Sequence, residues 1–291
     1  MKKYISLLRI KHYIKNLLIF LPLIFSGQFL NLPLLFITIV EFFSFSFVAS
    51  AIYIMNDLID YESDRKHPIK RKRTIASGLI SKKQASIILI VLLLLSMGVQ
   101  ILLYQTHCFT HTQFGLSNIY LLLYLAINFI YSKWGKHLPI VDILLLASGF
   151  LLRVYFGGVI IDVAISSWLY LTILSLSLYL VIGKRRGELK KNKKDARPVL
   201  KFYTSEFLDK FMYVFLSLTL VFYALWCTSG FVETNNLLIY SLFFVIFIVM
   251  KYSLIVEGDS YGDPVDVFFH DKTLIVVTIL YGIYMGVVLY G

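Results

Sequence analysis

Apolar residues along the chain fall in long blocks instead of alternating with polar residues. A helix needs a run of about twenty apolar residues to cross a bilayer. Runs near that length lie at about 15–32, 34–55, 85–104, 116–131, 140–161, 166–183, 211–229, 236–256 and 273–290. The pattern predicts an all-α transmembrane fold of about nine helices.

The composition supports a membrane protein. Of the 291 residues, 58% are hydrophobic and 15% charged, and the mean hydropathy is +0.77, whereas soluble domains carry about a quarter of their residues as charged side chains. The net charge of +11 would suggest nucleic acid as partner of a soluble chain. In a membrane protein it suggests Lys and Arg gathered on the cytoplasmic side. We therefore expect a lipid bilayer as the surroundings and no nucleic-acid partner.

Among the connections between the predicted spans, Lys and Arg occur only in alternate ones. Residues 1–16, 56–84, 132–138 and 184–210 hold five, eight, two and ten of them, and the connections at about 105–115, 162–166 and 230–235 hold none. The positive-inside rule then predicts a multi-pass protein of the cell (inner) membrane, with its N-terminus in the cytoplasm and its C-terminus on the outer side. An active site with charged groups is expected at the cytoplasmic face. We expect one membrane domain over residues 1–291, with cytoplasmic loops at about 56–84, 132–139, 184–210 and 257–272.

The first predicted cytoplasmic loop begins with an acidic stretch. Asn56, Asp60 and Asp64 are four residues apart, which places them on one face of a helix, and Asp57 lies three residues before Asp60. Mg²⁺ prefers oxygen ligands and often shares them with substrate phosphates. A merely solvated loop is disfavoured, because like charges at this spacing repel each other unless a cation neutralises them. The stretch predicts a Mg²⁺ site that holds a diphosphate.

This stretch resembles the NDxxDxxxD motif of the UbiA superfamily of intramembrane prenyltransferases. Four further stretches resemble its decaprenyl-phosphate phosphoribosyltransferase branch: Leu8–Asn16, His67–Gly78, Tyr131–Pro139 with Asp142, and Gly183–Leu189. The resemblance extends from near Arg9 to the stretch 262–264. It implies a UbiA-like bundle around a central cavity that opens to the cytoplasmic face and sideways to lipid.

One departure from the wider superfamily concerns the loop after the sixth span. Typical aromatic prenyltransferases carry a second aspartate-rich motif there, and this chain has Gly-Lys-Arg-Arg-Gly-Glu over 183–188. Lys and Arg side chains bind phosphate groups, whereas a second metal ion would be coordinated by carboxylates. The branch implies transfer of a 5-phosphoribosyl group from 5-phosphoribosyl diphosphate to a polyprenyl (decaprenyl-type) phosphate. No general base is needed, because a phosphate monoester is already an anion near neutral pH.

Matching motif positions assigns a role to each candidate residue. The predicted metal ligands are Asn56 and Asp60, then Asp57 and Asp64, and the three aspartates are the predicted catalytic residues. Residues predicted to bind the phosphoribosyl donor are Lys11, Lys15, Tyr53, Lys70, Arg71 and Arg73. Residues predicted to bind the lipid phosphate are Lys133, Lys136, Lys184, Arg185 and Arg186, with Asp142, Arg153 and Glu188 in supporting roles.

Several of these assignments have alternatives that the sequence leaves open. Tyr53 also suits an interfacial tyrosine, and Lys11 and Lys15 also suit contacts with lipid head groups. Arg153 suits a structural pairing within the membrane as well as a role in the site. A homo-oligomer is likewise left open.

Two other functions compete with phosphoribosyl transfer. One is transfer of an isoprenyl chain from its diphosphate to a small aromatic acceptor, against which the missing second aspartate-rich motif counts. The other is non-catalytic lipid transport. Transporters often show internal repeats and helices broken near the midplane, and the sequence shows no clear repeat.

Overall fold

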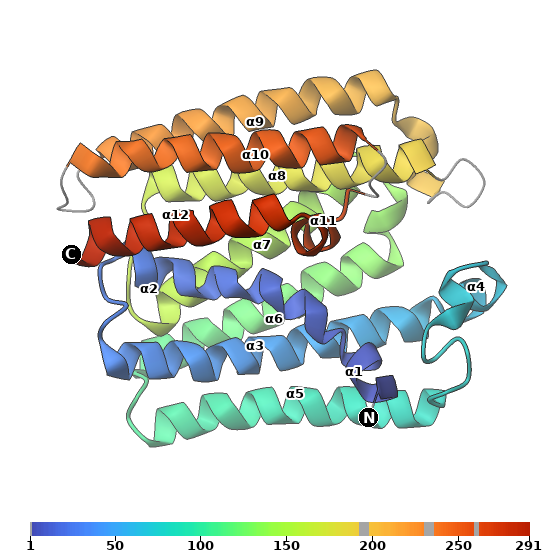
Figure 1. Cartoon of the computed structure of the whole chain (residues 1–291). Coiled ribbons are helices and arrows are strands. Elements are labelled where there is room, and N and C mark those ends of the chain that lie inside the picture. The colour runs from blue at the N-terminus through green and yellow to red at the C-terminus, as the bar shows by residue number, and fades with distance from the viewer. Residues whose placement is uncertain (1, 192–197, 230–235, 259–261) are drawn as a thin grey trace. The chain divides into compact units, whose positions relative to one another are not determined.

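The computed structural model describes residues 2–191, 198–229, 236–258 and 262–291. Within these ranges the chain is built from helices and contains no β-strand (Figure 1), which confirms the all-α prediction. The predicted outward connection at 230–235 lies outside the described residues. So do residues 192–197 and 259–261 of two predicted cytoplasmic loops.

The chain divides into two compact units. Unit 1 comprises residues 1–23, 29–136 and 152–163, and unit 2 comprises residues 24–28, 137–151 and 164–291. Helix α7 (Val141–Ile160) gives its first half to unit 2 and its second half to unit 1. The prediction of a single domain stays a prediction.

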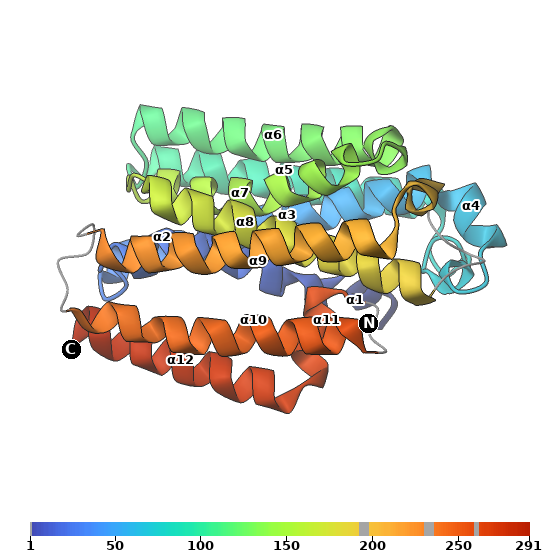
Figure 2. The same cartoon turned by 90° about the horizontal axis from the view of Figure 1, so that it is seen from above.

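Unit 1 is organised around the long helix α3, which packs against α5, α6 and η1 (Figures 1 and 2). Asn31 caps the start of α3 and Ser81 forms a capping box with Gln84 at the start of α5, so side chains satisfy N–H groups that both helix ends leave unpaired. The helices of unit 1 are α1 (Lys2–Leu8), η1 (Ile10–Phe20), α3 (Leu32–Ile59), α4 (Tyr61–Lys66), η2 (Lys70–Lys72), α5 (Lys82–Gln105), α6 (His111–Lys133) and the second half of α7. The short segments α2 (Leu21–Phe25) and η3 (Gly135–His137) lie where the chain passes between units.

Unit 2 is organised around α8, which packs along α9, and α10 packs against α12. Its buried core combines residues of α7, α8, α9 and α10, among them Tyr179, Leu208 and Val256. The helices of unit 2 are the first half of α7, α8 (Ser167–Lys191), η4 (Pro198–Phe202), α9 (Ser205–Thr228), η5 (Asn236–Ser241), α10 (Leu242–Glu257), α11 (Pro264–His270) and α12 (Lys272–Tyr290).

Eight helical segments in the described part of the chain are long and apolar enough to cross a membrane. They coincide with the last eight predicted spans, and they confirm a multi-pass membrane protein. The first predicted span, 15–32, has a different structure: η1 and α2 follow one another and end at Phe25. Gly27 has φ 73°, a left-handed conformation that ends helices and favours glycine. The total of nine spans stays a prediction.

A buried arginine connects η1 to α7 within unit 1. Arg153 Nε donates to Asn16 Oδ1 at 2.8 Å, and its Nη2 donates to the Tyr124 hydroxyl at 2.6 Å. One turn further along α7, a Cβ built on Gly157 would stand 2.2 Å from the carbonyl oxygen of Ile19. The absence of a side chain at Gly157 therefore lets the two segments meet closely.

A second buried polar cluster joins α3, α5 and α6 away from the acidic stretch. Glu41 is fully buried and accepts hydrogen bonds from Gln100 Nε2 on both carboxyl oxygens at 2.7 Å. The Ser117 hydroxyl donates to Gln100 Oε1 at 2.7 Å. Because unsatisfied polar groups are costly inside a membrane bundle, these bonds fix how the three helices pack.

Candidate active site

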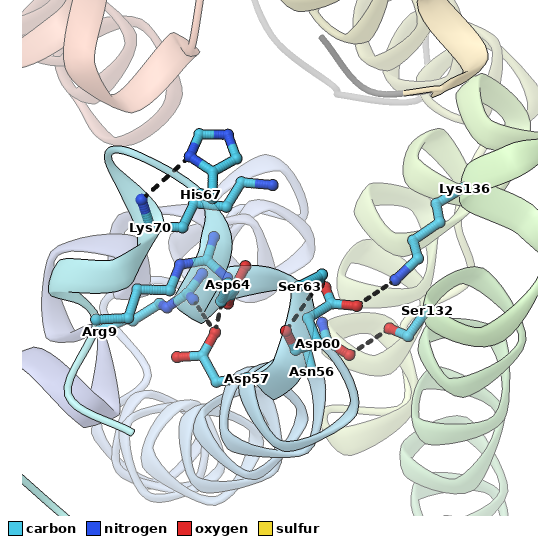
Figure 3. A network of polar contacts seen from close by, with 11 residues as sticks. Arg9, Asn56, Asp57, Asp60, Ser63, Asp64, His67, Lys70, Ser132 and Lys136 are labelled. Carbon is cyan, nitrogen blue, oxygen red and sulfur yellow. Dashed lines mark hydrogen bonds and ion pairs between the residues drawn. The ribbon is translucent and has the colours of Figure 1, made fainter. Parts of the chain in front are cut away.

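The acidic stretch lies where α3 passes into α4. The Asp60 N–H donates to the Asn56 carbonyl at 2.9 Å, and the Asp64 N–H donates to the Asp60 carbonyl at 2.8 Å. Backbone bonds four residues apart therefore carry the helical path through Asp60, as the spacing predicts. The four polar side chains nevertheless separate into two pairs with different partners (Figure 3).

Asn56 and Asp60 face the end of α6. Lys136 Nζ contacts Asp60 Oδ1 at 2.5 Å, and the Ser132 hydroxyl donates to the Asn56 side-chain oxygen (Figure 3). Lys136 was predicted to serve the lipid phosphate, and in unit 1 it lies against a predicted metal ligand. Ser132 was not singled out from the sequence, although it belongs to one of the stretches that carry the resemblance.

Asp57 and Asp64 face two arginines. Asp57 Oδ1 accepts from Arg9 Nη2 at 2.5 Å and from Arg73 Nη1 at 3.1 Å, and Arg73 Nη1 also donates to Asp64 Oδ2 at 2.7 Å. Both aspartates are buried, with 4% and 1% of their surfaces exposed. The four side chains form an alternating chain of charges in which a guanidinium offsets part of the cost of burying each carboxylate.

Arg9 is a residue that the sequence analysis missed. It lies within the stretch Leu8–Asn16, in which only Lys11 and Lys15 are predicted to bind the donor. Arg9 instead separates α1 from η1 with φ 51° and ψ 46°. Its guanidinium stacks on the Tyr53 ring, 4.8 Å from the centroid.

The other residues predicted to contact the donor have diverse surroundings. Tyr53 contacts Arg9 and also the His12 ring at 5.5 Å between centroids. His67 Nδ1 accepts from the backbone N–H of Ile69 and of Lys70, which orders the turn leading to Arg73 (Figure 3). Lys11, Arg71 and Lys133 are exposed, whereas Lys15 and Lys70 are half-buried. Lys133 lies over the Trp134 ring, 4.6 Å from the centroid.

The oxygen atoms of the acidic stretch fit a hard cation that takes few of its ligands from the protein. Within the described ranges, no three His, Cys, Asp or Glu side chains gather closely enough to hold a metal ion on their own. Mg²⁺ is commonly bound through one or two carboxylates together with waters and substrate phosphates. Asn56 and Asp60 supply oxygens on one side of the helix end, and the bond from Lys136 uses only one carboxyl oxygen of Asp60. That all four residues of the stretch bind a metal stays a prediction.

The basic stretch 183–188 belongs to unit 2, where its charged side chains pair with acidic ones. Lys184 Nζ contacts Asp263 Oδ2 at 2.6 Å, and Arg186 Nε contacts Asp209 Oδ1 at 2.6 Å. The fully buried Arg185 contacts Asp142 Oδ2 at 2.6 Å and Glu188 Oε2 at 2.7 Å. These contacts connect α8 to α7, to α9 and to the start of α11. The roles predicted for these residues toward a lipid phosphate stay predictions.

Tyr203 completes the cluster around Asp142 and was also missed from the sequence. Its hydroxyl donates to Asp142 Oδ1 at 2.5 Å and accepts from the backbone N–H of Ile140 at 2.6 Å. Burial raises the pKa of Tyr203, and its bond to the carboxylate raises that pKa further. The phenol therefore stays protonated and acts as a donor. Nothing in local sequence signals this contact, because the two residues are 61 positions apart.

Comparison with known proteins identifies the family. Residues 18–271 match the model of the UbiA prenyltransferase family. The chain is 31% identical to the decaprenyl-phosphate phosphoribosyltransferase of Corynebacterium glutamicum, over 94% of this chain and 83% of that protein. It is 29% identical to the enzyme of the same name from Mycolicibacterium smegmatis, over 93% of this chain and 87% of that protein.

Solved structures agree on the fold. A UbiA homolog from Archaeoglobus fulgidus, bound to GPP and Mg²⁺, matches 99% of this chain and 100% of its own with a TM-score of 0.71 at 19% identity. The same homolog bound to Cd²⁺ gives a TM-score of 0.67 at 18% identity. The acidic stretch at the end of α3, the eight apolar helices of the described residues and the match over 18–271 thus lead to one conclusion: this chain is an enzyme of the UbiA prenyltransferase family.

Proposed function

We propose that this protein transfers a 5-phosphoribosyl group from 5-phosphoribosyl diphosphate to a polyprenyl phosphate, releasing diphosphate. The observation that carries the proposal is the 31% identity to a decaprenyl-phosphate phosphoribosyltransferase across 94% of the chain. The partly exposed Arg9 and Arg73 at the acidic stretch support it, because the phosphoribosyl donor carries phosphate groups. The reaction would take place at the cytoplasmic face of the inner membrane.

In this reaction an oxygen of the lipid phosphate forms a bond to the anomeric carbon of the ribose as the bond from that carbon to the diphosphate breaks. Electrons of the breaking bond leave with the diphosphate, so stabilising that group is the main catalytic task. A bound Mg²⁺ would supply charge neutralisation for the leaving diphosphate.

The residues of this chain would hold the reactants in place. Asn56 and Asp60 would hold the cation, and Lys136, already beside Asp60, would bind an oxygen of the leaving group. No residue needs to remove a proton from the acceptor, because the lipid phosphate is already an anion. The remaining task is to hold the anionic donor and the anionic lipid phosphate side by side, which requires positively charged side chains in fixed positions.

The test is an assay with membranes that contain the protein. Labelled 5-phosphoribosyl diphosphate, a polyprenyl phosphate and Mg²⁺ are mixed, and label that enters the organic phase is measured with and without EDTA. We expect transfer that EDTA abolishes. Transfer from an isoprenyl diphosphate to an aromatic acceptor, with none from the phosphoribosyl donor, would refute the proposal in favour of prenyl transfer.

A matched pair of variants tests the site. Asp60→Asn should lower turnover by about 100-fold or more, the usual effect of losing one group that stabilises a transition state. Glu62→Gln changes an acid two residues away that is 77% exposed and contacts only Lys82 in the described structure, so it should act like wild type. If both variants are equally active, the prediction that Asp60 is an active-site residue is wrong.

A further inference from the structure

Arg9 adopts a backbone conformation that few residues other than glycine adopt. With φ 51° and ψ 46° it lies in the left-handed region, which for an arginine is strained by about 1 kcal/mol or more. Such strain persists only where the surroundings fix it, and it is common where a side chain serves a ligand. The kink between α1 and η1 directs the Arg9 guanidinium over the Tyr53 ring and onto Asp57.

A second guanidinium meets the first at the same carboxylate oxygen. Arg73 reaches Asp57 Oδ1 from the turn that follows α4, and Asp64 holds it from the other side. Arg9 and Arg73 come from opposite directions of the sequence, 48 and 16 residues away from Asp57. Asp57 therefore acts as a positioning residue for two arginines.

The two guanidiniums keep donors for a further anion. Arg9 and Arg73 are 24% and 31% exposed in their side chains, whereas the Asp57 side chain is 5% exposed. The described bonds use Nη2 of Arg9 and Nη1 of Arg73, and a guanidinium has five N–H donors. Two adjacent guanidiniums whose further donors are partly exposed match the oxygens of a phosphate group.

We propose that Arg9 and Arg73 bind the 5-phosphate of the phosphoribosyl donor and thereby select a phosphorylated sugar as the donor. This inference rests on the proposed function. The donor carries a diphosphate at one end and a phosphate monoester at the other. Asn56 and Asp60 lie on the opposite side of the helix end from Arg9 (Figure 3). If they hold the cation and the diphosphate of the donor, Arg9 and Arg73 remain available to bind its phosphate monoester.

A different explanation is that the arginines only neutralise Asp57 and Asp64. In that case replacing Arg9 would disturb the acidic stretch and slow the reaction with any donor. If Arg9 binds the 5-phosphate, its loss should affect only donors that carry this group. The two explanations therefore differ in how the effect depends on the donor.

The experiment compares Arg9→Gln with wild type on two donors, 5-phosphoribosyl diphosphate and its analogue that lacks the 5-phosphate. We expect KM for the phosphorylated donor to rise about 10- to 100-fold, since hydrogen bonds between charged groups contribute on that scale, with little change in kcat. With the analogue, wild type and variant should have the same kcat/KM. Ribose 5-phosphate should inhibit wild type competitively and Arg9→Gln at least about 10-fold more weakly.

Arg65→Gln is the matched control. Arg65 also stacks on a tyrosine, 5.6 Å from the centroid of Tyr61, but it is exposed and lies outside the arginine pair. We expect wild-type kinetics from it. If Arg9→Gln does not fold in detergent, Arg73→Gln is measured in the same way, and Arg9→Lys, which keeps the charge, should restore part of the affinity.

Two outcomes would overturn the inference. One is an unchanged KM for the phosphorylated donor in both Arg9→Gln and Arg73→Gln. The other is an equal loss on both donors, which would assign the arginines to neutralising the acidic stretch. If the wild-type protein transfers no phosphoribosyl group from either donor, the proposed function is refuted, and this inference is refuted with it. That failure appears in the wild-type assay alone, so it is distinguished from a failure of the inference, which appears in the variants.

Discussion

Replacing Asp142 by alanine removes the carboxylate that binds Arg185 and Tyr203, and we expect this change to destabilise unit 2 strongly. Both side chains of the ion pair are 0% exposed. Removing one partner of a buried pair costs about 3–5 kcal/mol, because the other charge stays buried. Glu188 still contacts Arg185 at 2.7 Å, which places the expected loss near the lower value. Tyr203→Phe loses the hydroxyl's bond to Asp142 and the bond it accepts from the Ile140 N–H, and it should cost about 1.5–3 kcal/mol.

The assay is unfolding of the purified protein in mild detergent, followed by tryptophan fluorescence. Trp168 and Trp226 lie in unit 2, and the third tryptophan, Trp134, lies in unit 1. Trp134 is therefore replaced by phenylalanine in every protein compared, so that the signal reports on the region that the substitution affects. Asp209→Ala is the control, since its ion pair with Arg186 is partly exposed and such pairs contribute about 1 kcal/mol or less.

A double variant tests the reasoning further. Leucine at both Asp142 and Arg185 removes the two charges together, and replacing a buried ion pair by apolar residues is often neutral. The double variant should therefore recover much of the stability lost in Asp142→Ala. A loss from Asp142→Ala no larger than that from Asp209→Ala, or no recovery in the double variant, would refute the account of this cluster.

Three further predictions concern stability. Gly157→Ala should cost about 1–3 kcal/mol, because its Cβ would overlap the Ile19 carbonyl, whereas Gly98→Ala, with open space around it, should be neutral or slightly stabilising in a melting experiment. Glu41→Leu should cost about 1–3 kcal/mol, because the buried Gln100 amide then keeps only its 3.4 Å bond to Ser44, and Glu41→Gln should cost less in the same measurement. The pKa of Tyr203 is raised in the folded state, so the protonated phenol contributes stability. This contribution is fully present below pH 10, the ordinary pKa of tyrosine, and is lost as the pH rises from there through the folded-state pKa. Stability should fall more steeply above pH 10 in wild type than in Tyr203→Phe, and parallel curves would contradict this.

Hydropathy alone was enough to place eight of the helices, because each is a single apolar block bounded by polar or charged residues. It could not predict how residues 10–25 are built. Apolar residues continue there without a break, but Arg9, Pro22 and Gly27 set the backbone path through local conformation. The prediction of one uninterrupted span over 15–32 was therefore wrong in its boundaries.

Spacing predicted that Asn56, Asp57, Asp60 and Asp64 lie together at the end of a helix. It could not predict which arginine or lysine each one binds, because those partners come from distant parts of the chain. Arg9 is 48 residues from Asp57 and Lys136 is 76 residues from Asp60. The spacing also placed Asp64 on the face of Asn56 and Asp60, and this was wrong: α3 ends at Ile59, and Asp64 lies with Asp57 at Arg73. A helical pattern gives the direction of a side chain only within one regular helix, and it carries no information about what packs opposite to it.

The contacts of Arg153 also bear on how the protein is made. Asn16 leaves the ribosome before its partner Arg153, which is synthesised 137 residues later. Domains commonly fold from the N-terminus during synthesis, but η1 obtains the arginine that satisfies Asn16, and the glycine against which Ile19 packs, only when α7 has entered the bilayer. Assembly of unit 1 is therefore completed by a late step in which α7 reaches η1, which already packs on α3 through the bond from Asn16 Nδ2 to Ser46. A ribosome-bound chain truncated before residue 153 should leave only the α7-facing side of η1 without its partners.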